Sequence, residues 1–478
     1  MTDPTAPSEI AGLGTDALLR AYRDRALSPV DVIEDVLARI ETVNPQVNAF
    51  CHVDSDGALA AARASEARWL RGEALGLDGI PVSVKDLQPV RGMPLRKGSR
   101  TTSSAPAEED APFVASFRRL GAVILGKTTT PEFGWKGVTD SPLTGITRNP
   151  WNTGKTPGGS SGGAAAAAAL NLGVLHQGTD GGGSIRIPAA MTGTVGLKPT
   201  FGWIPQVPPS VMTLLSHLGP IARTIDDLEH LFTAMAVPDS RDWTAIAPGR
   251  LSLDTNGPAK LDGLRIAYSP SLGHAEVDGE VAASVQRAVV RLEELGARVE
   301  EIDPGFEDPI DLFKTFWFSG AARALQTFDE TDLSTMDPGL VAVAEEARAV
   351  SAIDYLNADA ARFDLGVRMN AFHSRFDFLV TPTLAVSPFD VGCDTPRPTG
   401  PGDWTYWTPF TYPFNITQQP ALSVPCDPTP NGLPVGLQIV ARRFDDARVL
   451  NAGRAYLAAF PSKFPDRPRT NPLQENET

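Results

Sequence analysis

The spacing of apolar residues near the N-terminus predicts a layer of helices over residues 15–72. Thr15 and Ser28 are suitable N-caps, and Pro29 is a suitable first helical residue. Apolar residues recur at helical intervals in the segment that follows, at Val30, Ile33, Val36, Leu37 and Ile40. Such amphipathic helices are expected to form an outer layer of the protein.

Short apolar runs then alternate with further helical patterns. The first run, Ile80 to Val84, ends at Lys85. Strands are predicted at 80–84, 122–125, 173–176, 264–268, 297–302, 377–381, 421–425 and 435–441. Helices are predicted at 111–120, with Asp110 as cap, and at 223–236, 278–295 and 445–459. This alternation predicts an α/β protein whose central mixed sheet carries helices on both faces.

Three segments lack this regularity. Residues 237–262 are rich in Asp, Pro and Gly and are expected to form a surface loop. Residues 384–409 combine turn-forming residues with aromatic ones, so they form either a substrate wall or a loop pinned to the body by its aromatic rings. The polar, Pro-rich tail after Phe460 is expected to be loosely held.

Composition narrows the function classes. The 478 residues suffice for one large or two moderate domains, and a formal net charge of −15 argues against a nucleic-acid or acidic-membrane surface. The cysteines, Cys51, Cys393 and Cys426, show no metal-ligand spacing and are expected to be reduced and buried, which fits the cytoplasm. The sequence contains no signal-peptide pattern and no apolar run of 18 residues that would span a membrane.

Residues 156–200 concentrate Gly, Ser and Ala more than any other part of the chain. Ser160-Ser161 and Ser184 lie among glycines, which makes them candidate nucleophiles with backbone N–H groups close by as oxyanion donors. A flexible linker is the alternative. Residues typical of a core interrupt the stretch at Val174, Leu175, Ile185, Ile187, Val195 and Leu197. They favour a folded site over a linker.

Two familiar patterns in the chain are misleading. Residues 121–128, GAVILGKT, match a phosphate-binding loop, but their middle reads as a strand and no helix start follows. Residues 158–162, GGSSG, match a nucleophile elbow, but turn-forming residues precede them where a strand is needed. None of the six histidines has a context that suggests a serine–histidine triad, and no ligand cluster suggests a metal.

A serine without a histidine partner needs another base. A lysine can serve when burial keeps its amine neutral. Lys85 is the best candidate, because it ends an apolar strand that would bury its stem. A lone lysine is otherwise more often a solvated surface residue.

Read together, these segments resemble the amidase signature family. The resemblance rests on GIPVSVKD around Lys85, PGGSSGG around Ser160 and GTDGGGSIRIPAA around Ser184. It extends to RNPWNTGKT, VGLKPTFG, FDFLVTPT and GLPVGLQIVARRFDDARVL, and covers residues 15–460. It implies one α/β domain with a mixed sheet of about eleven strands. Residues 1–14 are then a flexible N-terminus, 80–200 the signature core and 461–478 the tail.

The resemblance also implies catalytic roles. In that family the triad is Ser–cis-Ser–Lys, so Ser184 maps to the nucleophile, Ser160 to the bridging serine and Lys85 to the base. The oxyanion donors map to the backbone amides of Gly181, Gly182, Gly183 and Ser184. Supporting positions map to Ser161, Asp180 and Arg186. The family often carries a side chain where this sequence has Gly181, which suggests more mobile oxyanion amides or a roomier cavity.

The leading hypothesis is a free-standing amide hydrolase that needs no cofactor or metal and acts as a monomer or homodimer on small molecules. Aromatic residues in segments that flank the pocket in relatives suggest bulky apolar or aryl amides; they are either substrate contacts or core. The main candidates are Phe133, Trp135, Trp317 and Trp404. Esters and carbamates share the same tetrahedral chemistry.

Two other hypotheses come from different classes. An amidotransferase A-type subunit, acting on charged tRNA with partner chains, would share all three motifs. Its relatives usually read SLDQIGP and GSD where this chain reads LLSHLGP and GTD. A non-catalytic protein on the same fold is less favoured, because Lys85 and both serines are retained.

Overall fold

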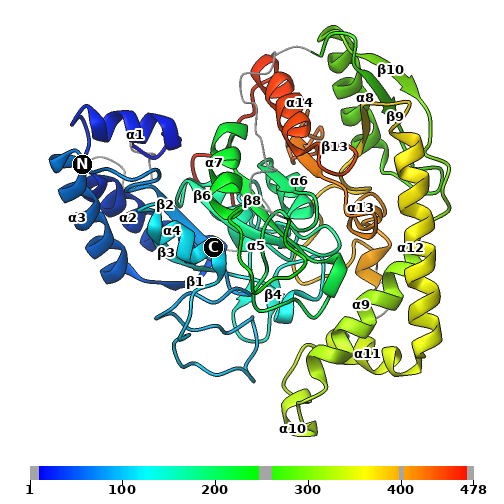
Figure 1. The fold of residues 1–478 in the computed structure, drawn as a ribbon, viewed down its shortest axis with the longest axis horizontal. Coiled ribbons are helices and arrows are strands. Elements are labelled where there is room, and N and C mark those ends of the chain that lie inside the picture. The colour runs from blue at the N-terminus through cyan, green and yellow to red at the C-terminus, as the bar shows by residue number, and fades with distance from the viewer. Residues whose placement is uncertain (1–9, 247–260, 398–402, 471–478) are drawn as a thin grey trace.

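The computed structural model describes residues 10–246, 261–397 and 403–470 (Figure 1). Its centre is a mixed sheet of eleven strands, as the resemblance implied. The strands are β1 (Phe50–Val53), β2 (Pro81–Lys85), β3 (Val123–Thr128), β6 (Leu175–Asp180), β7 (Val195–Lys198), β8 (His217–Ala222), β9 (Arg265–Tyr268), β10 (Arg298–Glu301), β11 (Phe378–Pro382), β12 (Ala421–Pro425) and β13 (Gly436–Val440). Their order is β1-β3-β2-β6-β8-β7-β12-β13-β11-β9-β10. A separate ribbon pairs β4 (Asp140–Ser141) with β5 (Gly145–Ile146).

Side chains alternate between the two faces of the sheet. Val82 and Val84 of β2 join a core formed with α4 (Pro112–Arg119), α7 (Ile225–Met235), α8 (Gly279–Glu294) and α14 (Asp446–Ala459). Because successive strand residues point to opposite faces, Lys85 points to the other side. That side carries α5 (Gly162–Ala169), α6 (Arg186–Thr192) and α13 (Tyr412–Ile416). Lys85 therefore lies on the face of the sheet that also carries the serine-bearing segments.

The predicted N-terminal helices are present at one end of the molecule (Figure 1). They are α1 (Thr15–Arg23), α2 (Pro29–Val47) and α3 (Ser55–Arg71), and β1 interrupts the segment that was expected to be wholly helical. Ser28 caps α2 as predicted, within a capping box closed by Asp31. The N-cap of α1 is Gly14 rather than Thr15, and that of α4 is Ala111 rather than Asp110.

At the opposite end lie helices that the sequence patterns did not predict (Figure 1). They are α9 (Ile310–Leu325), α10 (Glu330–Leu333), α11 (Pro338–Glu346) and α12 (Ala352–Phe372). Short 3-10 turns complete the described structure at Glu132–Gly134, Thr213–Leu215, Ala347–Ala349 and Asp403–Thr405. Among the described residues, no helix is both long and apolar enough to cross a membrane.

Lys127 explains the false match to a phosphate-binding loop. It lies within β3, which continues through the Gly-Lys-Thr of the pattern. Its Nζ is buried and lies 2.9 Å from the Asp86 carboxylate. The lysine is thus part of the core, and the strand leaves no phosphate-binding loop.

The irregular segments depart from expectation in two respects. Residues 461–470 of the tail are held rather than loose: Thr153 N donates to Arg469 O at 2.9 Å, and the Arg469 guanidinium stacks on Trp151. Cys393 is exposed and Cys51 and Cys426 are half-buried, so the expectation of buried cysteines is wrong; all three are free. Residues 237–246 form the expected surface loop, whereas the rest of the loop up to 260 lies outside the described residues.

Candidate active site

Lys85 lies at the end of β2 with its side chain fully buried. Its Nζ contacts three hydroxyl oxygens: Ser160 Oγ at 2.7 Å, Ser161 Oγ at 2.9 Å and Thr179 Oγ1 at 2.8 Å. Burial lowers the pKa of Lys85 well below the ordinary lysine value, and the more distant Asp180 opposes this only in part. The site therefore favours a neutral amine in contact with hydroxyl groups.

The hydrogen bonds of Ser161 fix its role beside that amine. Its Oγ donates to Thr179 O and accepts from Thr179 N, both at 3.2 Å. Because its only proton is used, Ser161 can only accept from Lys85. A neutral amine has two protons and one lone pair, so Ser160 remains free to donate its proton to Nζ.

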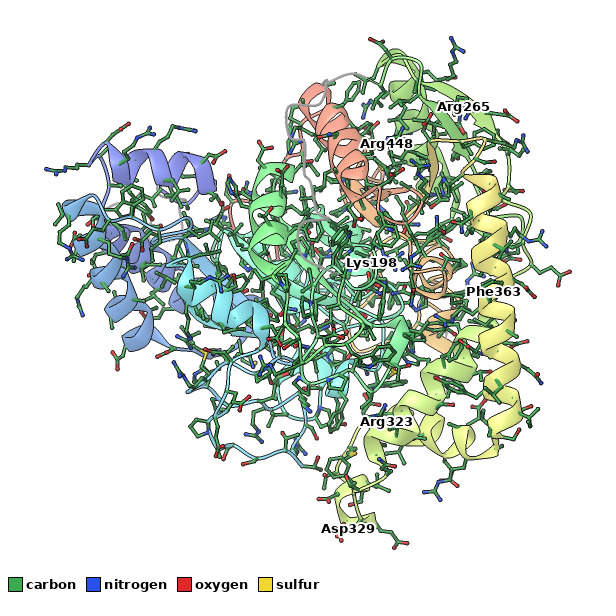
Figure 2. All side chains as sticks on the ribbon, viewed as in Figure 1. Lys198, Arg265, Arg323, Asp329, Phe363 and Arg448 are labelled. Carbon is green, nitrogen blue, oxygen red and sulfur yellow. The ribbon has the colours of Figure 1, made fainter. Side chains whose placement is uncertain are left out.

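Among the described residues, Lys85 differs in its partners from the two other fully buried lysines. Lys127 is paired with Asp86. Lys198, near the centre of the molecule (Figure 2), donates to the backbone oxygens of Pro199 and Gln419. Of the three, Lys85 is the one whose amine contacts serine hydroxyls.

Ser160 precedes α5 and follows a cis peptide bond from Gly159, as the resemblance implied. The backbone approaches its neighbours so closely that a Cβ at Gly159 would lie 2.4 Å from Val138 O. A Cβ at Gly163 would lie 2.5 Å from Ala49 O. The glycines are thus required by close packing, and the alanines of α5 are likewise buried.

Ser184 lies in the turn between β6 and α6. Its carbonyl accepts a hydrogen bond of 3.1 Å from Ser161 N, and it lines the same cavity as Ser160 and Thr179. The segment around it contains the buried ion pair of Asp180 and Arg186, with Arg186 Nε 2.9 Å from Asp180 Oδ2. Burial raises the pKa of Asp180, but the charge and hydrogen bonds of Arg186 outweigh it and hold that pKa well below its usual range.

The predicted oxyanion amides need one correction. Gly183 N donates to Asp180 Oδ1 at 2.8 Å, so this N–H is already committed. Within the described residues, the amides of Gly181, Gly182 and Ser184 have no such partner. The set of candidate oxyanion donors therefore narrows to these three.

Trp317 fills the space beside Gly181. A Cβ at Gly181 would lie 2.8 Å from the Trp317 ring, so the expected roomier cavity is wrong. Trp317 comes from α9 and lines the cavity, as does Phe133. Its indole N–H donates to Trp135 O at 3.0 Å, which fixes the ring against the site.

Two predicted substrate contacts belong to the core instead. Trp135 and Trp404 are almost fully buried and do not line the cavity around Ser184. The Trp404 ring packs 5.4 Å from that of Trp317 and so supports the cavity wall from behind. Trp407 is similarly buried, which supports the pinned-loop interpretation for the described part of residues 384–409.

The sequence patterns missed most of the remaining cavity wall. The cavity has a volume of about 160 Å³. Further lining residues are Leu87, Gln88, Lys97, Gln206, Pro208, Pro209, Ser210, Val211, Met212, Ser216 and Ala324. Only the proximity of Leu87 and Gln88 to Lys85 could have drawn attention to them. In the described ranges, no group of three or more His, Cys, Asp or Glu side chains is placed to hold a metal.

A buried lysine beside two serine-bearing turns on this α/β fold is the arrangement that the resemblance to the amidase signature family implied. The chain belongs to the Amidase family, whose model matches residues 31–450. It is 38% identical to an acylamidase of Rhodococcus erythropolis, over 91% of this chain and 93% of that one. It is also 34% identical to the A-type subunit of the glutamyl-tRNA(Gln) amidotransferase of Symbiobacterium thermophilum, covering 93% and 96%.

Solved structures agree with this assignment. A bacterial aryl acylamidase of the amidase signature family superposes with a TM-score of 0.88 at 28% identity. The match covers 95% of this chain and 97% of the aryl acylamidase. The fold is therefore that of the amidase signature enzymes.

Proposed function

We propose that Ser184, Ser160 and Lys85 form a Ser–cis-Ser–Lys triad that hydrolyses amides through an acyl-enzyme. The observation that carries this proposal is the buried Lys85 amine, 2.7 Å from Ser160 Oγ. Lys85 takes a proton from Ser160, which takes one from Ser184 as its Oγ attacks the acyl carbon. The same relay returns a proton to the leaving amine, and water then hydrolyses the acyl-enzyme.

The negative charge that develops on the acyl oxygen is held by the amides of Gly181, Gly182 and Ser184. Each such preorganised donor contributes about 3 kcal/mol in comparable enzymes. The Asp180–Arg186 pair positions the turn that carries these amides, since Asp180 accepts from Gly183 N. These residues orient the turn without touching the substrate.

The preferred substrates are bulky apolar or aryl amides. Phe133 and Trp317 give the cavity aromatic walls, and Leu87 and Met212 add apolar surface. Similarity to an acylamidase and to an aryl acylamidase supports this choice. Aryl esters and carbamates (urethanes) react by the same tetrahedral chemistry and are secondary substrates.

A turnover panel tests the proposal directly. Purified protein is offered aryl acylamides, aliphatic amides, p-nitrophenyl esters, aryl carbamates and glutamine. We expect the aryl acylamides to give the highest kcat/KM among the amides, and Ser184→Ala to abolish turnover of all of them. Full activity of Ser184→Ala would refute the triad.

The alternative is an amidotransferase A-type subunit, which the 34% identity to such a protein supports. That function requires glutaminase activity and partner chains that present a charged tRNA. Glutamine turnover above that of aryl amides, together with partner chains that co-purify, would favour it over the free-standing amidase.

A further inference from the structure

A cation that the triad does not use lies in the cavity wall. Lys97 lines the same cavity as Ser160, Ser184 and Trp317, and its side chain is half-buried. Within the described part of the chain, its Nζ has no hydrogen-bond or ion-pair partner. A half-buried charge without a counter-ion is unfavourable unless a ligand supplies one.

Asp86, the acid whose charge acts on Lys97, is already paired with another lysine. Asp86 Oδ1 accepts from Lys127 Nζ at 2.9 Å and from Arg96 N at 3.3 Å. Burial lowers the pKa of Lys97 and the charge of Asp86 raises it only in part, so Asp86 compensates the lysine incompletely. The charge of Lys97 is thus only partly compensated at the cavity wall.

Gln88 adds a second unsatisfied polar group to the same cavity. Its side chain is only 3% exposed, and its Oε1 is buried without a hydrogen-bond partner among the described residues. A side-chain amide can donate two hydrogen bonds and accept two. Beside the apolar walls, Lys97 thus offers the cavity a cation, and Gln88 Oε1 offers an acceptor for an N–H or O–H group of the bound molecule.

The backbone of Lys97 is held in place. Its φ of 52° lies in the left-handed region, and its carbonyl accepts a 2.8 Å hydrogen bond from Phe133 N. The next residue, Gly98, packs so closely that a Cβ there would lie 2.8 Å from Thr130 O. The lysine therefore projects from a fixed turn that is joined to the aromatic wall.

We propose that Lys97 binds a carboxylate of the substrate, so that the preferred substrates are anionic aryl or alkyl amides. This proposal rests on the function proposed above for Ser184. It assigns substrate selection to one local cation in a protein whose formal net charge is −15. A protein of that charge otherwise repels anions.

The test compares matched anilides in the wild type and in Lys97→Met. Acetanilide is the neutral substrate; 4-acetamidobenzoate carries a carboxylate on the amine part, and N-phenylsuccinamate carries one on the acyl part. We expect the wild type to prefer at least one carboxylate over acetanilide. Lys97→Met should lower kcat/KM for that substrate by about 10- to 100-fold, mainly through KM, as for loss of a charged hydrogen bond. Acetanilide should change by less than about twofold.

Two further variants test whether the effect comes from the cation at position 97. Lys97→Arg retains the cation and should retain most of the preference. Arg100→Met removes the same charge from the exposed part of the same turn, outside the cavity, and should leave the preference unchanged.

Three results would overturn the proposal: no preference for either carboxylate in the wild type, an equal loss on all three anilides in Lys97→Met, or no loss at all. The proposed triad would survive each of them, because acetanilide turnover that disappears in Ser184→Ala reports on the triad alone.

Discussion

At the residue scale, the neighbours of Lys85 decide what its amine can do. Burial alone does not distinguish it, since Lys127 and Lys198 are buried equally. The difference lies in the contacts with Ser160 and Ser161, which place hydroxyl groups rather than a carboxylate around Nζ. A lysine held in this way acts as a base only when it is neutral.

The pH dependence of activity follows from that requirement. Protonated Lys85 cannot accept a proton from Ser160, so kcat/KM for a neutral anilide should fall as the pH drops through the pKa of Lys85. Because burial lowers this pKa, the acid limb should lie below the range in which an ordinary lysine titrates. Lys85→Met should lower kcat/KM by about 10²- to 10⁴-fold and remove that limb.

Lys155 offers a control, since Lys155→Met removes a half-buried lysine that takes no part in the site. It should leave the pH profile unchanged. If Lys85→Met kept the acid limb of the wild type, another group would be the base.

The sequence predicted which side chains meet at the site better than it predicted the cavity walls. Motifs brought out Lys85, Ser160 and Ser184, and the structure places Lys85 against Ser160 and both serines on one cavity. Whether Trp135 faces the cavity or the core depends on packing against helices remote in the chain, and no local pattern encodes that. Gly183 differs from its neighbours only through a hydrogen bond to Asp180.

At the scale of the element, the turn from β6 to α6 depends on a buried ion pair. Arg186 reaches Thr411 O and Gln438 Oε1, both at 2.9 Å, while Asp180 accepts from Asn415 Nδ2 at 2.8 Å. Hydrogen bonds therefore join the turn to α13 and β13, in addition to the ion pair within the turn. Breaking the pair leaves a buried guanidinium without its counter-ion.

We expect Asp180→Asn to lower the free energy of unfolding by about 3–5 kcal/mol, the usual effect of removing one partner of a buried pair. Chemical denaturation measures the change. Replacing both partners, in Asp180→Asn/Arg186→Met, should recover part of the loss, because no charge then stays buried.

Asp24→Asn is the matched control. It removes a carboxylate 3.3 Å from Arg23 in an exposed pair, and should change the unfolding free energy by less than about 1 kcal/mol. Equal losses in Asp180→Asn and Asp24→Asn would contradict the role given to the buried pair.

Elements with a clear periodicity were predicted closely, whereas α9 to α12 were missed. The predicted strand 421–425 coincides with β12, and helix 278–295 is α8 within one residue at each end. In α9, four aromatic residues are buried and Asp311 and Arg323 are exposed, so the polar face is too narrow to mark the helix in sequence. The element that supplies the cavity wall was thus the hardest to predict.

At the scale of the whole molecule, Lys136 joins three distant segments. Its buried Nζ lies 2.8 Å from Asp140, 2.9 Å from Asp337 and 2.8 Å from Asp394. Burial lowers the pKa of Lys136, but the three carboxylates outweigh it and raise that pKa above the ordinary value. The lysine holds the start of α11 and the segment around Asp394 against the chain that carries Phe133.

Lys136→Met should therefore destabilise the fold by more than about 3 kcal/mol, because three carboxylates would face one another without a cation. Protonation of the carboxylates relieves their repulsion. The difference in unfolding free energy between wild type and Lys136→Met should therefore shrink as the pH falls through the range in which carboxylates titrate. Unfolding midpoints measured from neutral to acid pH check both expectations.

Lys155→Met again serves as a control, since Lys155 pairs with the exposed Asp390 at 2.9 Å. Its effect should stay below about 1 kcal/mol. A loss of unfolding free energy in Lys136→Met that became larger in acid would contradict the role given to Lys136 among its three carboxylates.

The central claim is that Ser184 attacks the substrate while Ser160 only transfers protons, and mass spectrometry of the trapped acyl-enzyme tests it most directly. The enzyme is mixed with a p-nitrophenyl ester, quenched within the first turnovers and digested to locate the acyl group. We predict one acyl group per chain, on the peptide that contains Ser184, and none in Ser184→Ala. Ser160→Ala should acylate slowly, still on Ser184. An acyl group on Ser160 in the wild type, or acylation that persists in Ser184→Ala, would contradict the account.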